Sequence, residues 1–192
     1  QLDCLTGTPA AIIFAASKDI DFKVLASLSK ESRKGAVVEY RVRDDSPIRS
    51  IADLKDKVMG HTGFKSATEL QMRLVLIGAN LNPDRDVRMT VVGFAQMADA
   101  LAASKVDLGT FAEPFAAAIK AKGGTRLLFT SKDVFPFDED LITFFCSSKF
   151  VAQHGDAVRT FLADFVATTK FYIANLRAAR QRLIDAKKTL IE

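Results

Sequence analysis

Short apolar runs alternate with longer amphipathic segments along most of this chain, which is the pattern of strands alternating with helices. Val87, Met89 and Val91, for example, alternate with Arg88 and Thr90, which predicts a half-exposed strand. The expected strands are 2–5, 22–27, 36–43, 57–61, 87–91, 106–110, 125–130 and 141–146. Because single helices separate most of these strands, we expect an α/β fold with mainly parallel sheets flanked by helices.

Capping residues mark the expected helix boundaries. Ser50 with Asp53, and Ser66 with Glu69, have the spacing of capping boxes, and Gly78 suits a helix C-terminus. The expected helices are 9–17, a short one after Ser50, 67–77, 94–104, 114–122 and a long C-terminal one from 156. The C-terminal helix has an apolar stripe, formed by Val158, Phe161, Phe165, Val166, Thr169 and Tyr172.

The composition is that of a globular protein of 192 residues, 48% hydrophobic and 26% charged. No apolar run approaches the ~20 residues of a membrane-spanning helix, so direct membrane insertion is not expected. The net charge is +4, with basic and acidic residues interspersed. The one dense basic cluster is Arg177, Arg180 and Arg182 with Lys187 and Lys188. It is typical of a solvated helix face, and nucleic acid is not an expected partner.

Residues directly after the strands are candidates for ligand binding, because ligands of open α/β sheets bind outside the carboxyl ends of the strands. Three groups of residues in this chain have that position. They are Thr6, Gly7 and Thr8; Gly63, Phe64, Lys65, Ser66, Ala67 and Thr68; and Phe111, Ala112 and Glu113. Free backbone N–H groups at the helix starts suit a carboxylate or a sulfonate.

Some of these residues have alternative interpretations. Lys65 either neutralises an anionic ligand or is solvated. Glu113 either binds a cationic or hydroxyl-bearing part of a ligand or only supports a helix N-terminus. Ordinary turn chemistry also accounts for Thr6, Gly7 and Thr8.

The sequence shows no catalytic or cofactor-binding motif. His61 and His154 lie in no nucleophile context, and the chain has no Gly-x-Ser-x-Gly elbow, no Gly-x-Gly-x-x-Gly and no P-loop. Cys4 and Cys146 lack the spacing of metal ligands. We therefore expect a binding function without catalytic residues, metal or cofactor.

Several motifs, taken in order, resemble those of one family. They are Ser-Pro-Ile-Arg-Ser-Ile-Ala-Asp-Leu-Lys-Asp-Lys at 46–57, Ser66-Ala67-Thr68, Gly78, Asn82-Pro83-Asp84, and Val106-Asp107-Leu108 leading to Glu113-Pro114. With them, the chain resembles solute-binding proteins of ABC importers, of the nitrate/sulfonate/taurine type. Related proteins often have an aromatic residue directly before Glu-Pro, where this chain has Ala112 and places Phe111 one position earlier.

The resemblance implies a two-lobed fold like that of periplasmic binding proteins, with the ligand cleft between the lobes. Ranges 1–43 and 141–192 correspond to the first lobe and 44–140 to the second. Gln1 resembles the entry to an internal strand, so we expect the first lobe to lack its N-terminal part. The implied ligand is a small anionic or polar organic solute, such as a sulfonate, a nitrate-like anion, a pyrimidine or an aromatic acid. The implied partner is the membrane permease of an ABC importer, and the implied location is periplasmic or tethered at the cell surface.

Two other functions occur on this kind of fold. An effector-sensing domain of a transcription regulator would need an upstream helix-turn-helix segment, and an enzyme of thiamin-pyrimidine synthesis relies on a cysteine-rich motif. The chain shows neither. The resemblance also places Cys4 and Cys146 in the same lobe, where they either form a disulfide or remain two buried thiols, which is the alternative we favour.

Overall fold

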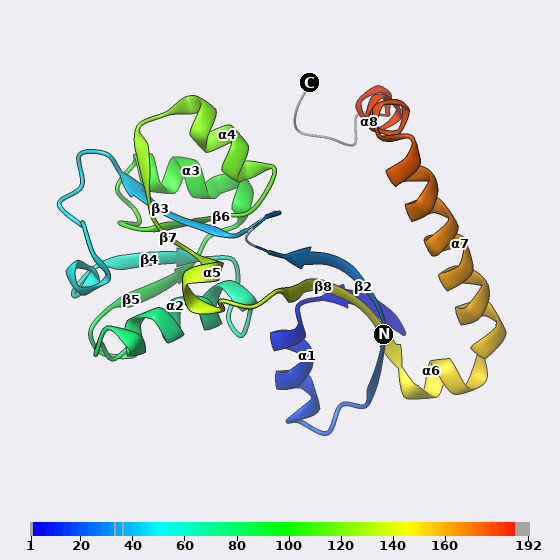
Figure 1. Ribbon diagram of the computed structural model, residues 1–192. Helices are drawn as coiled ribbons and strands as arrows, with labels where there is room; N and C mark the ends of the chain where they lie inside the picture. Colours follow the sequence, from blue (N-terminus) through cyan, green and yellow to red (C-terminus); the bar gives the residue numbers. More distant parts are fainter. Residues whose placement is uncertain (1, 33, 36, 187–192) are drawn as a thin grey trace. The chain divides into compact units, whose positions relative to one another are not determined.

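The computed structural model describes residues 2–32, 34–35 and 37–186 (Figure 1). The strands are β1 (Cys4–Gly7), β2 (Phe22–Glu31), β3 (Glu39–Arg43), β4 (Val58–His61), β5 (Arg88–Val91), β6 (Gly109–Phe111), β7 (Thr125–Thr130) and β8 (Glu139–Ser147). The helices are α1 (Pro9–Ala16), the 3-10 helix η1 (Ile51–Leu54), α2 (Ala67–Gly78), α3 (Phe94–Ala102), α4 (Phe115–Lys122), α5 (Ser131–Val134), α6 (Ser148–Gln153), α7 (Gly155–Ala174) and α8 (Leu176–Asp185). Strands and helices alternate along most of the chain, as the sequence predicts. The predicted strand 36–43 begins at Ala36, which lies outside the described residues.

The chain forms two compact units. Unit 1 consists of Gln1–Thr6, Asp21–Ala26 and Phe144–Glu192, and unit 2 consists of Gly7–Ile20 and Ser27–Thr143. The predicted lobes, 1–43 with 141–192 and 44–140, have different boundaries, and that division stays a prediction.

The described strands form three sheets, in the orders β1-β8-β2, β6-β3-β7 and β4-β5. β4 and β5 pair in parallel, as predicted. β3 differs from the prediction, because it pairs antiparallel with both β6 and β7. β6 and β7 are joined by α4 and both oppose β3, so they run in one direction with β3 reversed between them. Helix spacing predicts the crossover from β6 to β7, but it does not predict that a strand from earlier in the chain is inserted between them.

In unit 2, α2 covers one side of the sheets, and α3 and α4 cover the other (Figure 1). Apolar side chains are buried on both sides. The cluster on the α2 side consists of Val38, Tyr40, Val42, Ile48, Leu54, Met59, Met72, Leu76, Val87, Leu108 and Phe129. The cluster on the other side consists of Met97, Leu101, Val106, Phe111, Ala116 and Ile119. These two clusters hold the ends of the strands, and the helix starts that follow them, in fixed positions.

Tyr40 on β3 anchors the first turns of α2. Its ring stacks on Phe129 with the centroids 4.2 Å apart, and the residue is fully buried. Its hydroxyl donates to Gln71 Oε1 at 2.6 Å and lies 3.2 Å from the carbonyl oxygen of Thr68. Burial raises the pKa of Tyr40 well above its ordinary value, so the hydroxyl keeps its proton and remains a donor at neutral pH.

The capping residues fit their predicted helices, with two differences. Gly78 is the last residue of α2 rather than the residue that follows it, and Ala79 is the C-cap. Ser50 and Asp53 form the predicted capping box at η1. Ser66 caps α2 by accepting from the backbone N–H of Glu69 at 3.3 Å. The carboxylate of Glu69 does not complete a box with Ser66, because it accepts from the backbone N–H of Lys65, one residue earlier. Lys65 has a positive φ of 61°, which turns its N–H toward the helix.

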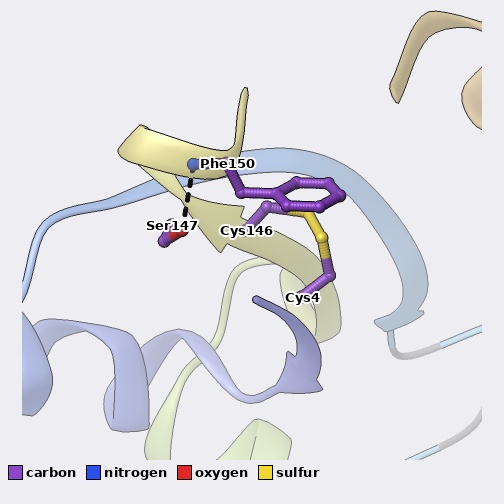
Figure 2. Close-up of a disulfide and its surroundings, with 4 residues drawn as sticks. All are labelled: Cys4, Cys146, Ser147 and Phe150. Atoms are coloured by element: carbon purple, nitrogen blue, oxygen red, sulfur yellow. Dashed lines mark hydrogen bonds between the residues drawn. A yellow bond between two sulfur atoms is a disulfide. The ribbon is translucent and has the colours of Figure 1, made fainter. Parts of the chain in front are cut away.

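Cys4 and Cys146 form a disulfide in unit 1, so the favoured prediction of two buried thiols was wrong (Figure 2). The physical reason is the sheet order: β1 and β8 are neighbours, and the two Cα atoms lie 4.0 Å apart. The ring of Phe150 lies beside the disulfide, and its backbone N–H donates to Ser147 Oγ at 3.1 Å (Figure 2). The side chains of Cys4, Phe144, Cys146, Phe150, Ala157, Val158 and Phe161 line an apolar cavity of about 350 Å³.

The C-terminal helical region begins at α6, earlier than predicted, and continues through α7 and α8. Of the predicted apolar stripe, Val158 is buried, whereas Phe161, Val166 and Tyr172 are exposed. Arg177, Arg180 and Arg182 lie exposed on α8. Lys187 and Lys188 of the same cluster lie outside the described residues. Among the helices of the described ranges, none combines the length and the apolar character that a membrane span requires.

Candidate functional site

A cavity of about 430 Å³ lies at the N-terminus of α2. It is lined by Thr8, Ser29, Glu31, Val37, Val38, Thr62, Ser66, Ala67, Thr68, Phe94, Ala112, Glu113, Leu141 and Ile142. All of these residues belong to unit 2. They come from both of the sequence ranges that were predicted to form separate lobes. The wall is mainly apolar, with polar groups at a few positions, which is the usual composition of a site for a small organic molecule.

Half of the predicted ligand-binding residues line this cavity, and half do not. The lining includes Thr8, Ser66, Ala67, Thr68, Ala112 and Glu113. Thr6, Gly7, Gly63, Phe64, Lys65 and Phe111 are not part of it. The cavity therefore brings together members of all three predicted groups, and their role in binding stays a prediction.

The start of α2 presents unused hydrogen-bond donors. The Ser66 hydroxyl accepts a hydrogen bond from the backbone N–H of Glu69. Within the described residues, the backbone N–H groups of Ala67 and Thr68 make no hydrogen bond. Two adjacent free N–H groups at the start of a twelve-residue helix bind oxygen atoms or anions favourably, with support from the helix dipole.

Three hydroxyl groups cluster beside these N–H groups. Thr68 Oγ1 lies 2.9 Å from Ser66 Oγ and 3.0 Å from Thr62 Oγ1. Thr68 Oγ1 also accepts from the backbone N–H of Thr62 at 3.2 Å. Thr68 is therefore a structural link between the residue after β4 and the start of α2, in addition to lining the cavity.

Phe64 and Lys65 lie outside the cavity lining. The Lys65 ammonium lies 5.9 Å from the ring centroid of Phe14 on α1, in a cation–π arrangement. Phe64 is 68% exposed, and its ring packs edge-on against His61. The position of Lys65 corresponds to the solvated alternative of the sequence analysis, with an aromatic ring beside it.

Thr8 and its neighbours start α1. Thr8 is the N-cap, and its Oγ1 accepts from the backbone N–H of Ala11 at 3.4 Å. Thr6 and Gly7 are the last residues of β1, and the carbonyl oxygen of Gly7 accepts from Thr143 Oγ1 at 3.1 Å. Only Thr8 of this group reaches the cavity, because the strand continues two residues further than predicted.

Glu113 supports the start of α4 and also lines the cavity. Its Oε2 accepts from the backbone N–H of Ala117 at 3.1 Å, which supports the first turn of α4, and its side chain also lines the cavity. Its Oε1 lies 3.7 Å from Lys120 Nζ. Phe111 is fully buried in the cluster with Met97 and Ala116, so its ring serves the core.

Glu31 is the most informative lining residue that the sequence analysis missed. It is the last residue of β2, which was predicted to end at residue 27. The side chain is fully buried, and its Oε1 accepts from the backbone N–H of Val38 at 3.1 Å. Its Oε2 has no hydrogen bond and lies 3.9 Å from Lys132 Nζ. Burial raises the pKa of the Glu31 carboxyl, and the charge of Glu139 adds to the increase, whereas Ser131 and Lys132 oppose it.

The other missed lining residues are Ser29, Val37, Val38, Thr62, Phe94, Leu141 and Ile142. Thr62 directly follows a predicted strand, so the rule that selected residues after strands applied to it as well. Phe94 is the first residue of a predicted helix. The remaining five come from strand ends and from the segment before β3, where sequence patterns do not show which side chain faces a cavity.

The described lining residues of this cavity include no histidine and no cysteine. His61 is buried outside the lining, and its Nδ1 lies 2.9 Å from the carbonyl oxygen of Gly63. In the described ranges no three His, Cys, Asp or Glu side chains are grouped in a way that could hold a metal ion.

The model of the NMT1-like family matches residues 3–185 of this chain. The chain belongs to the NMT1-like family. A search among curated protein sequences finds no match.

The solved structures that match this fold include binding proteins for sulfonates and a component of an ABC transporter. The periplasmic aliphatic sulphonate binding protein SsuA from Escherichia coli is 21% identical, with a TM-score of 0.71 over 96% of this chain and 56% of that protein. The alkanesulfonate-binding protein SsuA from Xanthomonas axonopodis pv. citri, bound to MOPS, is 19% identical, with a TM-score of 0.75 over 97% of this chain and 62% of that protein. A binding protein component of an ABC phosphonate transporter from Pseudomonas aeruginosa is 17% identical, with a TM-score of 0.61 over 83% of this chain and 55% of that protein.

The comparisons confirm the α/β fold of periplasmic binding proteins and the resemblance to the nitrate/sulfonate/taurine type. At these identities, the solved structures show the fold that this chain shares with them. The chain spans a little more than half the length of the two sulfonate-binding proteins.

Proposed function

We propose that this chain binds a small organic solute in the cavity at the start of α2 and belongs to a protein that delivers the solute to an ABC importer permease. The observation that carries the proposal is the pair of free N–H groups at Ala67 and Thr68 beside the hydroxyls of Thr62 and Ser66. These donors occupy one part of an otherwise mainly apolar wall. Such a wall holds the carbon skeleton of a solute, and the donors fix its oxygen-bearing group.

The relatives support the importer context. Their names describe binding proteins for sulfonates and for an ABC phosphonate transporter, and one is described as periplasmic. On this basis the proposal includes a permease as partner and a location outside the cytoplasm. The division into lobes 1–43 with 141–192 and 44–140 is also part of the proposal.

The proposed function is binding without chemical conversion. Catalysis needs a matched acid and base, or an activated nucleophile, positioned at the ligand. The hydroxyls of Thr62, Ser66 and Thr68 are bonded to one another, and that of Thr8 caps α1. No histidine or cysteine lies among the described lining residues.

A thermal-shift screen of the purified chain across sulfonates, nitrate, carboxylates, pyrimidines and amines tests the proposal. We expect at least one class to raise the melting temperature, because a ligand that binds only the folded state stabilises it by mass action. Mass spectrometry of the released solute should find it unchanged. The absence of any stabilising solute, or conversion of the solute, would contradict the proposal.

A further inference from the structure

A network of ion pairs begins with Glu113 in the wall of the α2 cavity. Glu113 Oε1 lies 3.7 Å from Lys120 Nζ, and the same ammonium group donates to Glu39 Oε1 at 2.9 Å. Glu39 Oε2 accepts from the guanidinium of Arg41 at 2.6 Å. The guanidinium also donates to the hydroxyl and the carbonyl oxygen of Thr125 on β7, at 3.1 and 3.0 Å. All five residues belong to unit 2, and of these five only Glu113 lines the cavity.

The four charged groups of this network balance one another. Glu39 and Glu113 carry one negative charge each, and Arg41 and Lys120 carry one positive charge each, so their sum is zero. Glu39 and Arg41 already form a neutral pair on β3, with side chains that are 11% and 9% exposed. The positive charge of Lys120 is therefore the one that offsets Glu113. The hydrogen bond to Glu39 raises the pKa of Lys120, which keeps the ammonium group charged at neutral pH.

Without this ammonium group, Glu113 would oppose the entry of an anion. Its side chain is 44% exposed, and it lines the same cavity as Ala67 and Thr68, which offer free N–H groups. A carboxylate without a counter-charge repels an anion, and close to a protein surface this repulsion rivals the gain from a hydrogen bond. Lys65, which the sequence suggested as a counter-charge, is not among the described lining residues.

We propose that Lys120 is a positioning residue that controls how the cavity discriminates between anionic and neutral solutes. It lies outside the described lining and acts through Glu113, whose charge it offsets. When Lys120 is removed, Glu113 keeps its hydrogen bond from Ala117, but its charge acts on the cavity in full. This inference rests on the proposed binding function and adds to it a residue that does not touch the solute.

Calorimetric titration with butanesulfonate and butanesulfonamide tests the inference. The two probes share a carbon chain and sulfonyl oxygens, but only the sulfonate is charged at neutral pH. We expect Lys120→Met to lower the ratio of sulfonate affinity to sulfonamide affinity about tenfold, which is the effect of one unit charge at a distance of about 10 Å with an effective dielectric constant of ~20. Lys120→Arg retains the charge and should retain the ratio.

A second substitution separates this electrostatic role from a structural one. Lys120→Met combined with Glu113→Gln removes the negative charge as well, while the amide oxygen can still accept from Ala117, so the ratio should recover. Damage to the packing of α4 would not be repaired in this way. Lys122→Met is the matched control, because Lys122 is an exposed lysine of the same helix outside the described lining, and it should leave the ratio unchanged.

The inference is overturned by an unchanged ratio in Lys120→Met, by an equal fall in Lys122→Met, or by a ratio that does not recover in the double variant. The absence of binding by both probes to the natural chain would overturn it as well. In any of these cases, a solute class that stabilises the chain in the thermal-shift screen would show that the binding function itself stands.

Discussion

The hydroxyl of Thr68 accepts a hydrogen bond from the backbone N–H of Thr62 at 3.2 Å, which fastens the first turn of α2 to the residue that follows β4. The same hydroxyl lies within 3.0 Å of the hydroxyls of Thr62 and Ser66. These three side chains hold the free N–H groups of Ala67 and Thr68 at the cavity. A substitution at Thr68 therefore changes the fold and the site together.

Thr68→Val should lower the free energy of unfolding by about 1 kcal/mol, because it leaves the partly buried N–H of Thr62 without its partner. Urea denaturation measures this loss. Thr160→Val is the control, since Thr160 is exposed on α7, and it should cost less than about 0.5 kcal/mol. Equal stability of the two variants would show that the link between Thr62 and Thr68 is not formed.

The disulfide between Cys4 and Cys146 should make a large contribution to stability, because it joins residues 142 positions apart. In the chain-entropy model a loop of this length is worth about 5 kcal/mol, as an upper value. Replacing both cysteines with serine should lower the urea midpoint strongly. A reducing agent should lower the midpoint of the natural chain and leave that of the double variant unchanged.

If the natural chain and the double variant unfold at the same urea concentration under oxidising conditions, the disulfide does not stabilise the fold. Titration of free thiols in the unfolded, unreduced chain gives an independent check, since it should detect none. Detection of two free thiols would instead support the prediction from the sequence that both cysteines are reduced.

Asp53 should give a measurable pH dependence to the capping box at η1. Hydrogen bonds from the backbone N–H groups of Arg49 and Ser50, and from the Ser50 hydroxyl, lower the pKa of Asp53. A lowered pKa means that the carboxylate contributes stability above the ordinary Asp value of ~3.9 and loses it as the pH falls through the value in the folded state.

NMR titration of the Asp53 carboxyl should therefore find a pKa below the ordinary value. The stability difference between the natural chain and Asp53→Asn should shrink as the pH falls from neutral into that range. A pKa at or above the ordinary value would contradict the capping geometry.

Local features were predictable from the sequence, and features that depend on distant pairing were not. Ser50 and Ser66 cap their predicted helices, because a cap bonds only to residues two or three positions ahead. Cys4 and Cys146 form a disulfide because β1 and β8 are neighbours in a sheet, which no local pattern shows.

The candidate site shows the same division. Ser66, Ala67 and Thr68 were predicted from the helix start and line the cavity. Glu31 was missed because the predicted strand ended at residue 27, whereas β2 continues to residue 31 in the sheet with β8. Phe111 was assigned to the site, but it is packed in the core cluster with Met97. The direction of a side chain at a strand end depends on this packing, which the sequence does not show.

The central claim is that the free N–H groups at the start of α2 bind the solute, and Ala67→Pro tests it most directly. Ala67 is the first residue of α2, where proline is favoured, and Ser66 before it has the extended conformation that a following proline requires. The substitution removes one unbonded N–H and leaves the helix intact. Calorimetric titration should use the tightest solute from the thermal-shift screen, with the melting temperature of the unliganded protein as control. The account predicts an unchanged melting temperature and an affinity about threefold to a hundredfold weaker, according to the charge of the bound oxygen. Unchanged affinity in the Ala67→Pro protein would contradict it.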